Sequence, residues 1–187
     1  MRLHACSALL AVAVALAVVP ALRAQTVILV RHAEKASVPG NDPPLSQAGE
    51  ARAEALAAAL MNAGVSHVIV TSRQRTALTA AIVTRDGHLT PVAVPLGDGD
   101  SAHVAAVAAA VRKVPRTDAV LVVGHSNTIP RIIAALGGPT LPDLCDAEYA
   151  TLFVLELDAR PVRLVRAHYG APDAPDAGSC TNQMENR

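Results

Sequence analysis

Two histidines in this chain each follow an apolar, β-branched run at the point where the run meets polar sequence. Arg31 and His32 come after a run that ends at Val30, and His125 comes shortly after a run that ends at Val123. Such runs are typical of buried parallel strands, and the carboxyl ends of those strands hold the ligand sites of α/β sheets. The pattern therefore predicts that both imidazoles lie in one crevice.

The side chains in this crevice are suited to phosphoryl transfer. A neutral imidazole is a nucleophile when one ring nitrogen is held as a donor, usually by a backbone carbonyl, and we expect His32 to have this role. Arginine binds two phosphate oxygens through its planar fork. Arg31 is adjacent to His32. Arg75 follows another apolar run, at 68–70, closely enough to point back over the sheet edge. Arg73 would take the role of Arg75 only if the helix after this run were shifted in register. We interpret Arg73 as a solvated charge at a helix start.

The order of these segments resembles the histidine phosphatase superfamily, the phosphoglycerate-mutase-like proteins. That family carries Arg-His-Gly after its first strand and Gly-His after a later one, which correspond here to Arg31-His32-Ala33 and Gly124-His125. The resemblance runs from about residue 26 to residue 169. It also includes a Leu-Ser-x-x-Gly segment at 45–49 and, at 71–80, a segment similar to the family's Ser-x-x-x-Arg-x-x-x-Thr-Ala element.

The resemblance implies a phosphatase that passes through a phosphohistidine on His32, which water then hydrolyses. Arg31, Arg75 and His125 would form the anion cradle, with His125 preferably protonated or donating. Asn127 either adds a donor to the substrate or caps a helix. The implied substrate is a small phosphorylated compound, and we expect no metal and no cofactor.

One signature position departs from the family pattern, because Ala33 stands where the family has glycine. Alanine is strained where φ must be positive, so we expect an ordinary backbone conformation there. The general acid is less clearly marked. Asp98 and Asp100 lie in the loop after the third strand, where they could equally form a turn and a cap. Glu34 is close to His32 in sequence, but alternation along an extended chain could turn it away. Asp98 and Glu34 are the candidates.

Other functions remain open. A phosphomutase of the same superfamily is one, although only a short segment, 37–43, is available to close over a substrate. A non-catalytic phosphate-binding module is another, and the retention of both histidines and both arginines argues against it. A metal-dependent hydrolase is the third; His32 and His125 lack the i, i+4 or Cys-rich spacing of a metal site.

Residues 1–24 are typical of a signal peptide, with Arg2 before an apolar stretch and small residues before Gln25. We expect a periplasmic or secreted protein with no stable membrane insertion; an uncleaved anchor is the alternative, because Leu22 and Arg23 make the cleavage site imperfect. Without Arg2 and Arg23, the 16 basic and 16 acidic residues become 14 and 16, a net charge of −2. This balance gives no basic field for nucleic acid.

The remaining chain is long enough for one domain, which we place at 25–170. Strands alternating with helices predict a three-layer αβα fold with a mainly parallel sheet and a late antiparallel pair. The strands are expected at 27–30, 68–70, 91–95, 120–123, 152–157 and 162–167. The helices are expected at 46–62, after 72, at 102–114 and from 128 or 130 to 136. Residues 171–187 read as a flexible tail. Cys145 and Cys180 are either bridged or both unpaired.

Overall fold

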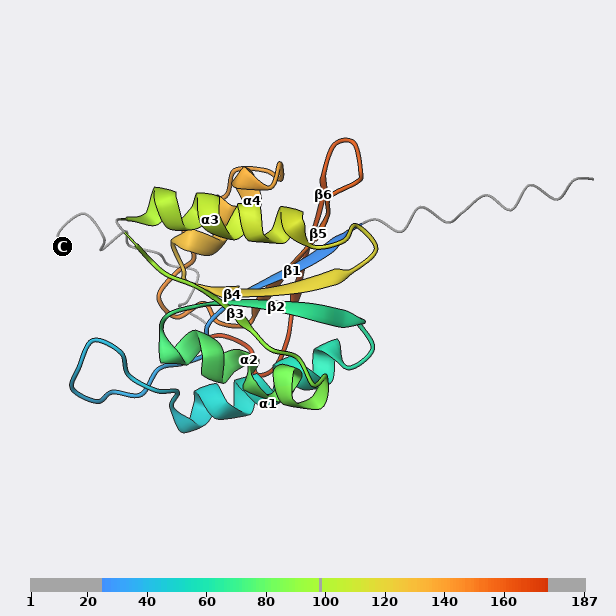
Figure 1. Ribbon diagram of the computed structural model, residues 1–187. Coiled ribbons are helices and arrows are strands. Elements are labelled where there is room, and N and C mark those ends of the chain that lie inside the picture. The colour runs from blue at the N-terminus through green and yellow to red at the C-terminus, as the bar shows by residue number, and fades with distance from the viewer. Residues whose placement is uncertain (1–24, 98, 175–187) are drawn as a thin grey trace, which may run out of the picture.

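One six-stranded sheet organises the part of the chain that the structure describes, residues 25–97 and 99–174 of a computed structural model (Figure 1). The strand order is β3-β2-β4-β1-β5-β6. The first four strands are mutually parallel, while β5 runs antiparallel to both β1 and β6. The strands are β1 (Thr26–Arg31), β2 (Val65–Thr71), β3 (Val92–Val94), β4 (Ala119–Gly124), β5 (Thr151–Glu156) and β6 (Arg163–His168). The predicted mainly parallel sheet with a late antiparallel pair is confirmed.

Helices cover both faces of this sheet, which gives the expected three layers. In Figure 1, α1 and α2 lie against one face and α3 and α4 against the other. The helices are α1 (Gln47–Leu60), α2 (Gln74–Asp86), α3 (Asp100–Lys113) and α4 (Thr128–Ala135). None of the helices in the described ranges is long and apolar enough to cross a membrane.

Alternation along β1 explains why its sequence is apolar throughout 27–30. Val27 and Leu29 pack into the cluster under α3 and α4, whereas Ile28 and Val30 pack into the cluster under α1 and α2. A strand buried on both faces by helices has no polar side to show. The same holds for β4, whose six residues are all buried.

The element boundaries agree with the sequence where a local signal marks them. Ser46 caps α1, as predicted, by accepting a hydrogen bond from the amide of Gly49 at 3.2 Å. β2 begins at Val65, earlier than the predicted 68, because pairing with β4 extends into the polar residues before the apolar run. α3 begins at Asp100, two residues before the predicted start.

Several predictions concern segments outside the described residues: the signal peptide at 1–24, Asp98, Cys180 and most of the tail. The first residues of that tail are described, and they are bound to the domain. Asp173 accepts hydrogen bonds from the amides of Tyr149 at 2.8 Å and Ala150 at 2.9 Å. Cys145 is disulfide-bonded, and since it is the only cysteine within the described ranges, its pairing with Cys180 stays a prediction.

Candidate active site

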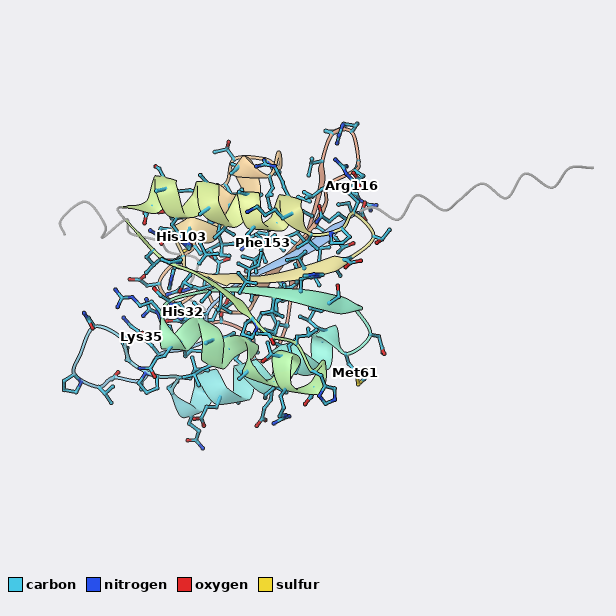
Figure 2. The ribbon with its side chains drawn as sticks, viewed as in Figure 1. His32, Lys35, Met61, His103, Arg116 and Phe153 are labelled. Atoms are coloured by element: carbon cyan, nitrogen blue, oxygen red, sulfur yellow. The ribbon has the colours of Figure 1, made fainter. Side chains whose placement is uncertain are left out.

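A cleft of about 350 Å³ opens at the carboxyl ends of the parallel strands. Figure 2 shows His32 and Lys35 at this end of the molecule, while Met61 and Arg116 lie at the opposite end. The cleft is lined by four cationic side chains and two acidic ones, together with both predicted histidines; its lining comprises Arg31, His32, Lys35, Arg73, Arg75, Leu96, Asp100, His125, Ser126, Asn127, Thr128 and Asp146. The predicted crevice is therefore present, with Arg31, His32, Arg75, His125 and Asn127 around it.

His32 is held as a neutral imidazole with a defined tautomer. Its Nδ1–H donates to the carbonyl of Ala33 at 2.8 Å, and its own amide donates to the carbonyl of Gly124 at 2.9 Å. Burial, with Arg31, Arg75 and Lys35 nearby, lowers the pKa of His32 to about 3. Since Nδ1 carries the proton, Nε2 presents a lone pair at neutral pH.

Ala33 occupies the glycine position of the signature without strain. His88 is the only non-glycine residue with positive φ in the described ranges, so the expected ordinary backbone at Ala33 is confirmed. Its amide donates to the hydroxyl of Thr79 at 2.9 Å, and that hydroxyl donates to the carbonyl of Arg75 at 2.7 Å. Thr79 thus links the strand that carries His32 to the helix that carries Arg75, which gives the Arg-x-x-x-Thr spacing a structural reason.

The start of α1 packs directly on the residue that follows Ala33. The carbonyl of Glu34 accepts hydrogen bonds from the amide of Ser46 at 2.9 Å and from its hydroxyl at 3.3 Å. A Cβ added at Gly49 would lie 2.2 Å from the same carbonyl oxygen. The Leu-Ser-x-x-Gly segment therefore fixes the chain beyond His32, and only glycine permits so close an approach.

The carboxylate of Glu34 lies away from the cleft. Arg52 donates to it from Nε and Nη2 at 2.9 and 2.7 Å, and the guanidinium also donates to the carbonyls of Tyr169 and Ala171. Ion pairing with Glu34 raises the pKa of Arg52 despite its burial. Of the two acid candidates, the structure thus does not bring Glu34 to His32, and Asp98 lies outside the described residues.

His125 faces His32 across the cleft, with ring centroids 5.3 Å apart. Nη2 of Arg75 can only donate, so at 3.4 Å it makes Nδ1 of His125 an acceptor and leaves the proton on Nε2, which donates to the hydroxyl of Thr71 at 3.2 Å. Burial and the neighbouring His32 and Arg75 lower the pKa of His125 to about 3. Of the two forms considered from the sequence, the geometry favours the neutral donor over the protonated ring.

Both predicted arginines keep a buried donor that is unused. Nε of Arg31 and Nε of Arg75 are buried and have no hydrogen-bond partner in the described structure. Arg75 is otherwise paired with Asp42 at 3.5 Å, and burial together with the nearby Arg73 lowers its pKa. An unpaired buried N–H is costly, so a hydrogen-bond acceptor that reached either donor would stabilise the site.

Asn127 lies in the wall of the cleft. It occupies the N-cap position of α4, but its side chain makes no cap hydrogen bond. Its amide instead donates to the carboxylate of Asp100 at 2.7 Å, which also accepts from Arg131 at 3.2 Å. Asn127 therefore positions the acidic residue that lines the cleft, and its amide is engaged there.

Sequence reasoning missed Tyr149 and Asp42. The Tyr149 ring lies 4.1 Å from the guanidinium carbon of Arg31 and 6.3 Å from the ring of His32. Tyr149 stands in a loop more than a hundred residues from Arg31, so no local pattern links them. The scarcity of aromatic residues could have drawn attention to Tyr149, since the chain has only two tyrosines and one phenylalanine. Asp42 lies in the segment 37–43, where no motif marks it as a functional residue.

Fold and cleft together define an α/β protein of the phosphoglycerate-mutase-like class, with paired histidines and arginines at the carboxyl edge of its sheet. The model of the histidine phosphatase superfamily, branch 1, matches residues 27–95 of this chain. The matched segment contains Arg31, His32 and Arg75, while His125 lies beyond it.

Solved structures support this assignment. The chain is 25% identical to a candidate phosphohistidine phosphatase, SixA, from Agrobacterium tumefaciens, with a TM-score of 0.56 and a match covering 79% of this chain and 99% of that one. A candidate α-ribazole-5′-P phosphatase from Escherichia coli gives a TM-score of 0.62 at 16% identity, covering 80% of this chain and 100% of that chain. A mycobacterial glucosyl-3-phosphoglycerate phosphatase gives a TM-score of 0.58 at 17% identity, covering 80% of this chain and 100% of that chain. The last two likenesses concern the fold alone. Comparison with curated proteins gives no match.

The lowered histidine pKa values predict a loss of stability in mild acid. Both rings have a pKa of about 3 in the folded protein, against 6.5 for a free imidazole. As the pH falls from 6.5 towards 3, the unfolded chain binds protons that the folded chain does not. Each histidine then lowers the free energy of unfolding by about 1.4 kcal/mol per pH unit.

Urea unfolding at pH 7, 6 and 5 measures this slope. A His32→Gln variant should have a slope lower by about 1.4 kcal/mol per pH unit, because one such group is gone. A His168→Gln variant, changed at an exposed position of β6, is the matched control and should keep the parental slope. Equal slopes in all three proteins would contradict the neutral state of His32.

Proposed function

We propose that the protein is a phosphatase that hydrolyses a small phosphomonoester through a phosphohistidine on His32. One observation carries the proposal: the Nε2 lone pair of His32 lies in a small cleft where Arg31 and Arg75 each keep an unpartnered buried N–H. A neutral nucleophile beside donors without partners suits a substrate that brings its own negative charge.

The reaction would take two displacements. In the first, Nε2 attacks phosphorus, the bond from phosphorus to the ester oxygen breaks, and the alcohol leaves with a proton. In the second, water attacks the phosphohistidine, the N–P bond breaks, and inorganic phosphate leaves. Arg31 and Arg75 donate to the equatorial oxygens, and the neutral His125 ring adds its Nε2–H as a further donor.

The proton for the leaving alcohol has fewer sources than the sequence suggested. Glu34 is bound by Arg52, so it is not placed to protonate a leaving group. Asp98 stays the candidate from the sequence. Asp100 is the described carboxylate of that segment; it lines the cleft and is held by Asn127 and Arg131.

Hydrolysis is favoured over mutase chemistry by the shortness of the segment after His32. The amide of Ala36 donates to the carbonyl of Pro44 at 2.9 Å, and Lys35 pairs with Leu45, so the chain returns to the domain after a short excursion. A mutase must keep water from its phosphohistidine, and this segment is small for that purpose. The disulfide at Cys145 in turn supports the expected export, because such bonds persist in oxidising compartments.

Residues 25–187 incubated with an aryl phosphate in ¹⁸O-water and a metal chelator test the proposal. A phosphatase releases phosphate that carries one solvent oxygen, and the chelator does not slow it. Transfer of the phosphoryl group to an added polyol without ¹⁸O uptake would indicate the mutase instead. No turnover with aryl phosphates, small phosphate esters or phosphohistidine, together with phosphate binding, would indicate the non-catalytic module.

A further inference from the structure

We propose that the segment 145–149, here called the clamp loop, positions Arg31 for phosphoryl binding, and that Tyr149 is the positioning residue within it. The inference rests on the proposed function in one respect: it takes Arg31 as a donor to the phosphoryl group. It adds a second part of the chain to the site, because neither the signature motifs nor the family match includes these residues.

The clamp loop occupies one side of the Arg31 guanidinium. Nη1 donates to the carbonyls of Cys145 at 2.6 Å, Asp146 at 2.9 Å and Glu148 at 3.2 Å. Nη2 lies 3.4 Å from the hydroxyl of Tyr149, and the ring stacks at 4.1 Å from the guanidinium carbon. The Nε edge is left, and it is the buried edge without a partner.

This arrangement orients the Arg31 guanidinium and leaves its Nε–H without a protein partner. Arginine has five N–H donors in one plane, and three carbonyls on Nη1 together with a ring on its face fix that plane. A donor held in place before the substrate arrives loses little freedom when it binds, so its contribution to the transition state is larger. Arg75 is held differently, by Asp42 and His125, and therefore serves as an internal reference.

The clamp loop is itself held at both of its ends. The amide of Leu144, just before it, donates to the carbonyl of Ser126 at 3.0 Å, and Cys145 is disulfide-bonded. At the other end Asp173 accepts from the amides of Tyr149 and Ala150. A loop tied at both ends can hold a long side chain in one orientation, which free loop carbonyls could not do.

A double-mutant cycle tests whether Tyr149 acts through Arg31. Tyr149→Leu removes the stacked ring and should lower kcat/KM about 10-fold, in line with a partly desolvated cation–π contact. Tyr149→Phe keeps the ring and should stay near the parental value. In an Arg31→Lys background Tyr149→Leu should cost almost nothing, whereas in an Arg75→Lys background it should cost the full 10-fold.

A second readout does not depend on turnover. Calorimetric titration with inorganic phosphate should show the same pattern in Kd, so the inference is testable even if the parent protein releases no phosphate and the proposed function fails. Asp173→Ala loosens the clamp loop from outside the cleft, so it should also lower kcat/KM and weaken phosphate binding, and only when Arg31 is present. This variant decides the question if Tyr149→Leu does not fold. The proposal would be overturned if Tyr149→Leu lowered kcat/KM equally in the Arg31→Lys and Arg75→Lys backgrounds. It would also be overturned if Tyr149→Leu kept the parental activity and Kd.

Discussion

Replacing His32 with alanine should abolish phosphate release while leaving the fold intact. Loss of a covalent nucleophile typically removes about 10⁶-fold in rate, which is the largest effect any single change in this cleft can have. The folded state should survive, because the imidazole makes one hydrogen bond, to the carbonyl of the next residue, and lies at a cleft rather than within either core cluster.

Rapid quench with a labelled aryl phosphate checks the covalent step directly. The parent protein should give an acid-labile phosphoprotein, and His32→Ala should give none. His168→Ala is the matched control, an exposed histidine on β6 whose loss should change neither label nor rate. Label that maps to Ser46 or Ser126, or parental turnover in His32→Ala, would remove His32 from the centre of the mechanism.

Replacing Arg75 should cost about 10²- to 10³-fold in kcat/KM, as expected when one preorganised donor to transition-state charge is lost. The side chain is 16% exposed, bound by Asp42 and aimed at His125, so its orientation is set before any ligand enters. Arg75→Lys is the more informative change. It keeps a partner for Asp42 but loses the planar fork, and its rate should fall between those of the parent and Arg75→Ala.

The control for Arg75 lies on the same helix. Arg85 is in the last turn of α2, it is 71% exposed and it pairs with Asp86. With a rise of about 1.5 Å per residue, it stands about 15 Å from Arg75 along the helix axis. Arg85→Ala should leave kcat/KM unchanged, and steady-state kinetics with one aryl phosphate suffice for all the variants. An equal loss at both positions would mean that net charge, not a placed donor, drives binding.

The layers of the fold and the pairing of His32 with His125 could be predicted from sequence because both depend on local signals. A strand buried on both faces reads as an unbroken apolar run, and a cap such as Ser46 stands next to the helix that it starts. The carboxyl ends of parallel strands meet at one edge whatever the connections between them. His32, Arg75 and His125 follow from that geometry alone.

The remaining features depend on contacts that no local pattern encodes. Glu34 is turned from the cleft because Arg52, on a helix that starts a dozen residues later, binds it. The neutral state of His125 is set by burial and by surrounding cations, neither of which is visible before folding. Tyr149 meets Arg31 only because β5 returns antiparallel beside β1 and brings its preceding loop to the same edge.

The central place of β1 has a consequence for how the domain folds. This strand is made first, yet it pairs only with β4 and β5; Val27, for example, lies beside Val120 and Leu155. Contacts between residues so far apart in sequence require large loops to close before they stabilise anything, which slows folding. Until β4 at 119–124 is available, the strand that leads to His32 has two unpaired edges, and until β5 at 151–156 is available it keeps one, so it can associate with other chains. We therefore expect the cleft around His32 to be among the last features that the folding chain completes, well after its helices form.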